Sequence, residues 1–132
     1  MNSSTKNQPL WRRTNYALAG LAAAVATERS LRVELAVIPL VVVALLLLRV
    51  EAEWWALAGL ACALVVTAEL INTALEKLCD HLHPAHHPAV GIVKDCAAAA
   101  VLVSCLGSLA VGAALAVHLY QRGLAPLPTF LH

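Results

Sequence analysis

Residues 54–75, WWALAGLACALVVTAELINTAL, decide the fold because they form one long apolar run. A transmembrane helix needs about 20 predominantly apolar residues, and this run carries a single charged side chain, Glu69. The pair Trp54 and Trp55 at its start is typical of the headgroup level of a bilayer. The run therefore predicts a membrane-spanning helix, assigned to residues 54–76, with one carboxylate inside it.

Two further apolar runs flank this helix. Residues 35–48 are uninterruptedly apolar and predict a span over residues 34–50 if the flanking side chains snorkel. Residues 96–120 carry no formal charge and predict another span, after which Arg122 resembles an interfacial anchor. The fold class expected is therefore an all-α membrane protein with three transmembrane helices, followed by a short tail over residues 121–132.

The composition excludes two broad classes of function. Of 132 residues, 61% are hydrophobic and 13% are charged, whereas globular proteins average about 45–50% apolar and about 25% charged. Three spans leave too little chain for a separate soluble enzyme, so we expect a single membrane domain over residues 1–132. A net charge of +1 offers no basic surface for nucleic acid. Four cysteines without a C-x-x-C pair predict no disulfide framework.

The lysines and arginines predict the orientation in the membrane. Seven of them lie before the first span or in the second connection, and two lie on the other side: Lys6, Arg12, Arg13, Arg29, Arg32, Lys77 and Lys94 against Arg49 and Arg122. The positive-inside rule then places the N-terminus and the loop over residues 77–95 in the cytoplasm and the C-terminus outside.

The N-terminal region is predicted to lie on the membrane surface. Residues 1–33 would form a cytoplasmic tail followed by an amphipathic helix, because Leu18, Leu21, Ala22 and Val25 make one apolar stripe. The first apolar run starts far from Met1 and is followed by further membrane segments, so we expect no signal peptide.

Glu69 is the residue that most needs an explanation. A carboxylate inside a membrane costs about 2.5–3.5 kcal/mol on insertion scales and therefore indicates function. Glu69, Asn72 and Glu76 lie at i, i+3 and i+7, on one face of the second span, with Glu69 about 10 Å deeper than Glu76. The deeper group suits proton abstraction and the shallower one a divalent cation. Interhelical hydrogen bonding is the alternative, but it needs fewer polar groups.

Other charged residues are predicted to gather at the same cytoplasmic interface. Glu28 and Glu34 flank Arg32 before the first span, and Lys94 with Asp95 precedes the third. Carboxylates for a metal and a lysine for a phosphate are what phosphoryl transfer requires. The simpler interpretation is that the basic residues anchor the protein and that Asp95 caps a helix.

A histidine-rich segment offers a competing, non-enzymatic interpretation. His81, His83, His86 and His87 lie between Cys79 and Cys96, so a metal-binding membrane protein is one alternative, and an ion-conducting oligomer using Glu69 is another. The spacing matches no standard ligand pattern, and the neighbouring prolines favour a rigid turn.

The polar motifs together resemble one known family. ELINTALEKLCD (residues 69–80), KDCAAAAV (residues 94–101) and TERSLRVEL (residues 27–35) are similar to the signature of prokaryotic diacylglycerol kinases and undecaprenol kinases. The resemblance extends over roughly residues 12–120. Ser30 stands where many members carry asparagine or an apolar residue.

This resemblance implies a homotrimer in the bacterial cytoplasmic membrane, with active sites shared between neighbouring subunits. It implies Glu69 as the general base for the lipid hydroxyl, Glu28 and Glu76 as ligands of Mg²⁺ on ATP, and Asn72 as an orienting group. The expected nucleotide contacts are completed by Tyr16, His87, Lys94 and Asp95, and the expected lipid contacts by Arg32, Glu34 and Glu69. The activity expected is ATP-dependent phosphorylation of diacylglycerol to phosphatidic acid, with undecaprenol as the alternative substrate.

Overall fold

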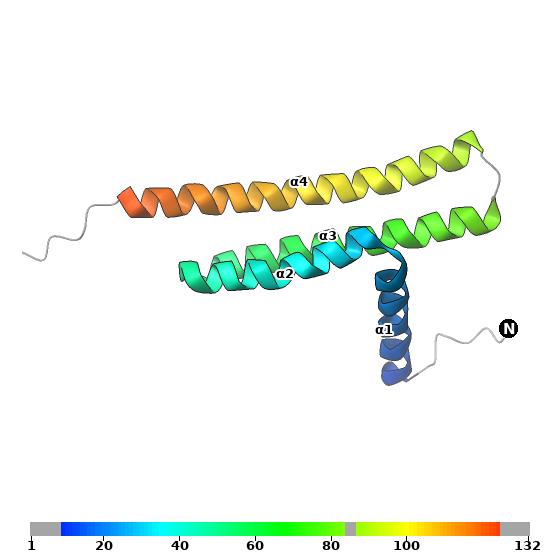
Figure 1. The fold of residues 1–132 in the computed structure, drawn as a ribbon, viewed down its shortest axis with the longest axis horizontal. Coiled ribbons are helices and arrows are strands. Elements are labelled where there is room, and N and C mark those ends of the chain that lie inside the picture. Colours follow the sequence, from blue (N-terminus) through cyan, green and yellow to red (C-terminus); the bar gives the residue numbers. More distant parts are fainter. Residues whose placement is uncertain (1–8, 84–86, 125–132) are drawn as a thin grey trace, which may run out of the picture.

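The computed structural model describes residues 9–83 and 87–124, which fold into four helices (Figure 1). These are α1 (Leu10–Thr27), α2 (Arg29–Leu48), α3 (Ala52–Leu82) and α4 (Pro88–Leu124). The last three are long and apolar enough to cross a membrane. The prediction of an all-helical protein with three possible spans is therefore confirmed, while the surface location of α1 and the trimer stay predictions.

The connection between α3 and α4 differs most from expectation. Most of the loop predicted over residues 77–95 is helical instead, because α3 continues to Leu82 and α4 begins at Pro88. Residues 76–82 contain good helix formers and neither glycine nor proline, so nothing ends the helix there. Proline suits the first turn of a helix, where its missing N–H is not needed. His86 lies outside the described residues.

The other helix bounds also differ from the predicted spans. α2 begins at Arg29 rather than at residue 34 and ends at Leu48 rather than at residue 50, and α4 continues through Leu124. Only Arg49, Val50 and Glu51 separate α2 from α3, so the connection between these helices is a tight turn. Where the bilayer surfaces cross these helices stays a prediction, and residues 125–132 of the expected tail are outside the described part of the chain.

A single extended residue separates α1 from α2. Glu28 has φ −99° and ψ 121°, so the chain turns there and α1 points away from the other three helices (Figure 1). The Arg32 guanidinium donates to the carbonyls of Val25 (2.9 Å) and Ala26 (3.2 Å). These are carbonyls that a helix end leaves without partners. Arg32 therefore stabilises the end of α1.

α3 is the central element of the packing. Both α2 and α4 pack against it, and the described backbones of α2 and α4 do not approach each other. An apolar cavity of about 560 Å³ lies between the three helices, with Val37 of α2, Val65 of α3 and Leu109 of α4 in its wall. The cavity and the functional site described below thus share the face of α3 that looks toward α2.

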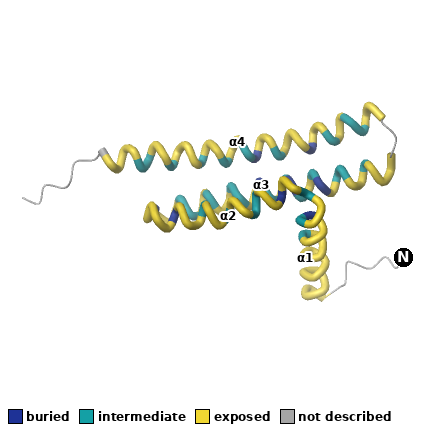
Figure 2. The backbone as a smooth tube through the Cα atoms, in the orientation of Figure 1, coloured by how far each residue is buried: buried dark blue, intermediate teal, exposed yellow. Residues whose placement is uncertain are grey.

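Many large apolar residues are exposed, and Figure 2 colours much of all four helices as exposed. Leu47 is 78% exposed, and Leu60 and Leu109 are each 69% exposed. A monomer in water rarely shows apolar patches of this size, whereas hydrocarbon chains or a neighbouring subunit accommodate them. The pattern is that of helices surrounded by lipid or by other membrane helices.

An ion cluster joins the start of α3 to the end of α4. The Arg122 guanidinium lies 2.9 Å from a Glu51 oxygen, and His118 Nε2 lies 3.5 Å from the other oxygen. The His118 ring also packs on Trp54, with centroids 5.3 Å apart. A hydrogen bond from its own backbone N–H, then the charges of Arg122 and His118, hold the pKa of Glu51 below its ordinary 4.5, against some desolvation.

This cluster predicts an acid-sensitive contact. A carboxylate whose pKa is lowered by folding adds stability that is present above its unfolded pKa and is lost as the pH falls through its folded pKa. We therefore expect a Glu51→Gln variant to lose less thermal stability than the wild type between about pH 6 and about pH 3.5. Circular dichroism melts in detergent measure this, with Glu53→Gln, an exposed carboxylate in the same helical turn, as the matched control. Parallel curves for Glu51→Gln and wild type would contradict it.

Candidate functional site

The polar stripe of α3 lies within one continuous helix, as its spacing predicted. Glu69, Asn72, Thr73 and Glu76 share a face, and Glu69 and Thr73 are only 5% and 4% exposed. The Asn72 amide donates to a Glu76 oxygen at 3.3 Å. The Asn72 Oδ1 atom is buried and has no hydrogen-bond partner among the described residues. An unpartnered buried acceptor of this kind calls for a ligand, a water or a neighbouring chain.

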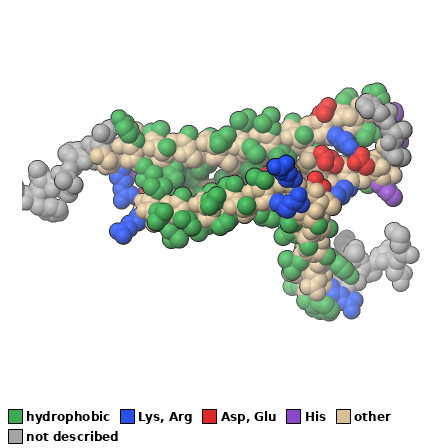
Figure 3. All heavy atoms as spheres, in the orientation of Figure 1, with side chains coloured by type: hydrophobic (Ala, Val, Ile, Leu, Met, Phe, Trp, Pro, Cys, Tyr) green, Lys and Arg blue, Asp and Glu red, His purple; other side chains and the backbone are tan. Residues whose placement is uncertain are grey.

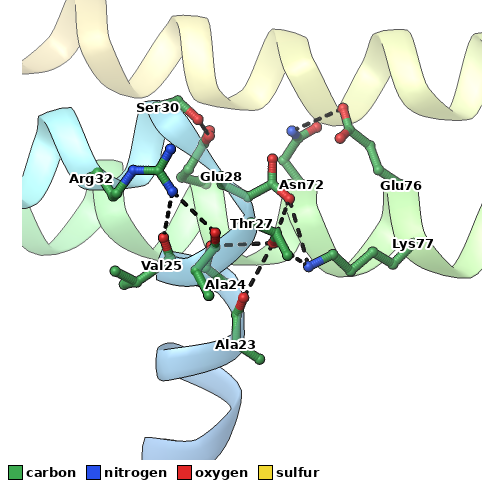
Figure 4. A network of polar contacts seen from close by, with 12 residues as sticks. Ala23, Ala24, Val25, Thr27, Glu28, Ser30, Arg32, Asn72, Glu76 and Lys77 are labelled. Carbon is green, nitrogen blue, oxygen red and sulfur yellow. Dashed lines mark hydrogen bonds and ion pairs between the residues drawn. The ribbon is translucent and has the colours of Figure 1, made fainter.

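The first turns of α2 bring two polar side chains to the deeper end of this stripe. The Ser30 hydroxyl donates a hydrogen bond to Oε1 of Glu69, and Figure 4 labels Ser30 in the first turn of α2. The carboxylate of Glu34 lies close enough to Glu69 for electrostatic repulsion, and its Oε2 atom is buried without a partner among the described residues. Glu69 is therefore held between a donor and a like charge from the same neighbouring helix.

The break between α1 and α2 brings Glu28 to the same region. The Lys77 ammonium of α3 donates to Thr27 Oγ1 at 2.6 Å and forms an ion pair with Glu28 at 3.6 Å. Thr27 in turn donates to Glu28 at 2.9 Å. Figure 4 shows these side chains meeting beside Asn72 and Glu76 of α3. Residues about fifty positions apart are thus joined by one polar network.

The third group of predicted site residues lies where α4 begins. The Lys94 ammonium lies 2.5 Å from Asp80 of α3 and also attracts Glu76 electrostatically. His87 Nδ1 accepts the N–H of Ala89 at 3.2 Å. Figure 3 shows most of the visible acidic side chains gathered at this end of α3 and α4, while hydrophobic side chains cover the rest of the three helices.

Three predicted residues lie outside the close network. Tyr16 is 61% exposed on α1, about three turns before the break. Asp95 is exposed on α4, next to Lys94. Arg32 was predicted to contact the lipid, but its guanidinium donates hydrogen bonds to the carbonyls at the end of α1. The described chain brings Glu28, Glu34, Glu69, Asn72 and Glu76 near one another and leaves these three aside.

Sequence reasoning did not assign a role to Ser30, Thr27 or Lys77. Ser30 precedes Glu34 by one helical turn, so the two share a face once the helix is known to begin at Arg29. The prediction assigned residues 1–33 to the surface segment and residues 34–50 to the span, which placed Ser30 and Glu34 in different segments and concealed that signal. The Lys77 contacts depend on how α1 leaves α2, which no local pattern indicates.

The arrangement provides distinct chemical parts at different depths. The buried carboxylate of Glu69 suits a general base, because it accepts one hydrogen bond and keeps a second oxygen. Glu28 and Glu76 offer oxygen ligands of the kind that Mg²⁺ prefers. The described residues contain no group of three His, Cys, Asp or Glu side chains able to hold a metal alone, so a cation here needs ligands from a bound molecule or another chain.

Comparison with known proteins gives a consistent result. A family model described as "Prokaryotic diacylglycerol kinase" matches residues 15–116. A curated relative, "Diacylglycerol kinase" of Synechocystis sp., is 40% identical over 101 residues, which are 76% of this chain and 58% of the relative. The chain thus matches somewhat more than half of that protein's length. The region matched by the family model includes every residue of the polar network, and the chain belongs to the prokaryotic diacylglycerol kinase family.

Proposed function

We propose that this protein is an integral-membrane lipid kinase that transfers the γ-phosphoryl group of ATP to the hydroxyl of diacylglycerol, giving phosphatidic acid. The observation that carries the proposal is the buried Glu69 carboxylate, in line with Asn72 and Glu76 on one face of α3. Family membership and the name of the Synechocystis relative favour diacylglycerol. Undecaprenol is the alternative, because tail contacts come from apolar residues that do not distinguish the two lipids.

The reaction needs one proton transfer and one phosphoryl transfer. Glu69 takes the proton of the lipid hydroxyl as that oxygen bonds to the γ-phosphorus, and the bond from the γ-phosphorus to the bridging oxygen breaks to release ADP. The lipid arrives by diffusion within the membrane, so the protein only has to hold ATP at the surface and align the hydroxyl. This explains how so short a chain provides a kinase site.

Glu28 and Glu76 are proposed to hold Mg²⁺ on ATP. Magnesium sites commonly use one or two carboxylates together with substrate phosphates, which fits a region lacking three protein ligands among the described residues. The buried, unpartnered Oδ1 of Asn72 lies beside Glu76 and fits an orienting role toward such a site. When bound, the cation would offset the negative charge of the phosphates.

The nucleotide contacts are proposed to come from the start of α4. Lys94 would reach the phosphates, because its ammonium lies at the end of α3, where it pairs with Asp80 and is attracted by Glu76. Asp95 follows Lys94 directly in the chain, and His87 lies just before α4 begins. Tyr16 would join these nucleotide contacts only if α1 of the same or a neighbouring subunit lies against the start of α4.

A homotrimer with shared sites is proposed for the assembly. Glu34 Oε2 and Asn72 Oδ1 are buried without partners in the described chain, and apolar side chains cover the outer faces of the helices. If neighbouring subunits complete each site, a single chain considered alone would show both the unpartnered polar atoms and the exposed apolar faces. We place the protein in the bacterial cytoplasmic membrane, with the N-terminus inside and the C-terminus outside, as the positive-inside rule predicts.

A parallel kinase assay tests the activity and the substrate together. Purified protein in detergent micelles receives radiolabelled ATP, Mg²⁺ and either diacylglycerol or undecaprenol. We expect label in phosphatidic acid at a rate well above that in undecaprenyl phosphate. The reverse order would reassign the substrate, and label in neither lipid would reject the lipid kinase.

A further inference from the structure

We propose that Ser30 is a positioning residue for the phosphoryl transfer, whose hydroxyl holds the Glu69 carboxylate in the orientation that receives the substrate proton. The inference rests on the proposed function and deepens it, because it assigns a role to a residue that the sequence motifs left without one.

The contact joins two helices at the buried end of the polar stripe. Ser30 lies in the first turn of α2, two residues after the break at Glu28, and its Oγ atom donates to Oε1 of Glu69 on α3. Figure 4 shows Ser30 reaching across from α2. Within residues 9–83 and 87–124, no other hydrogen bond to this carboxylate is formed. The position of Glu69 therefore depends on one hydroxyl from another helix.

A neighbouring negative charge makes this hydroxyl important. Glu34 follows Ser30 by one turn of α2 and faces the same carboxylate, which it repels. The only donor that offsets this repulsion is the Ser30 hydroxyl, as far as the described chain extends. A carboxylate fixed through Oε1 keeps Oε2 for the lipid hydroxyl, whereas an unrestrained one can rotate away from Glu34 and from its substrate.

One kinetic consequence follows from this geometry. Losing the hydrogen bond misplaces the base without changing the groups proposed to bind ATP, so kcat falls while the KM for ATP stays near that of the wild type.

The test compares three variants with the wild type in the micelle assay. We expect Ser30→Ala to lower kcat about tenfold with the KM for ATP within about twofold. Ser30→Thr keeps a hydroxyl on the same carbon and should recover most of kcat. Ser104→Ala removes a serine of α4 whose hydroxyl donates to the carbonyl of Ala100 in its own helix, and should match the wild type.

The outcomes separate this inference from the proposed function. An active wild type with a Ser30→Ala variant of equal kcat overturns the positioning role and leaves the kinase assignment intact. A loss of kcat that Ser30→Thr does not recover, with a lowered melting temperature, shows a purely structural residue and also overturns it. A wild type that phosphorylates no lipid rejects the kinase, and this inference with it.

Discussion

Replacing Glu69 by glutamine is expected to abolish lipid phosphorylation while the protein stays folded. The amide has nearly the same shape as the carboxylate, and its oxygen can still accept the hydrogen bond from Ser30. It cannot take a proton from the lipid hydroxyl at neutral pH. Because general bases contribute about 10²–10⁴-fold to rates, we expect turnover in the micelle assay to fall by at least about 100-fold.

Two comparisons make this result specific. Glu53→Gln removes a carboxylate from the exposed first turn of the same helix and should keep wild-type turnover. Glu69→Asp keeps a base but shortens its reach by one methylene group, so intermediate turnover is expected. Gel filtration and circular dichroism check that each variant retains its assembly and helical content. A folded Glu69→Gln variant with more than about a tenth of wild-type turnover would remove the general base from the proposal.

The parts of this site that sequence could predict are those within one helix. Apolar length alone predicted the three long helices, and the 3.6-residue period placed Glu69, Asn72 and Glu76 on one face of α3. The helices and the shared face depend only on neighbouring residues, which is why both hold in the structure. A carboxylate within an apolar run also indicates function without any tertiary information, and that role stays a prediction.

The parts that sequence could not predict depend on contacts between helices. The break between α1 and α2 lies at Glu28, where no glycine or proline indicates the end of a helix. Hydrogen bonds from Arg32 to the end of α1 fix the geometry of this break. The contact of Ser30 with Glu69 spans 39 positions and follows from how α2 packs on α3. At the α1–α2 break the sequence did not indicate the end of a helix, whereas at residues 77–95 it suggested a loop that is mostly absent. Histidines and prolines favoured a loop there, although most of the segment is helical.

Replacing Glu28 or Glu76 by glutamine is expected to raise the Mg²⁺ concentration needed for half-maximal activity. Each substitution removes one negative oxygen ligand and keeps the size of the side chain. The Mg²⁺ ion on ATP can therefore still reach the site but binds there more weakly. We expect a shift of about tenfold or more in the Mg²⁺ titration at saturating lipid. Excess Mg²⁺ should restore a large part of the activity, which distinguishes both residues from Glu69, where no concentration of Mg²⁺ should do so.

Glu28 needs a further control, because its carboxylate also pairs with Lys77 at 3.6 Å. A shift in the Glu28→Gln variant could arise from loosening α3 from the α1–α2 break instead of from losing a metal ligand. Lys77→Met breaks the same ion pair and leaves the Glu28 carboxylate in place. Since the pair is partly exposed, its loss should cost little stability, and Lys77→Met should titrate with Mg²⁺ like the wild type. If Lys77→Met reproduces the Glu28→Gln shift, Glu28 acts through the helix contact and Glu76 alone remains as the proposed carboxylate ligand of this chain.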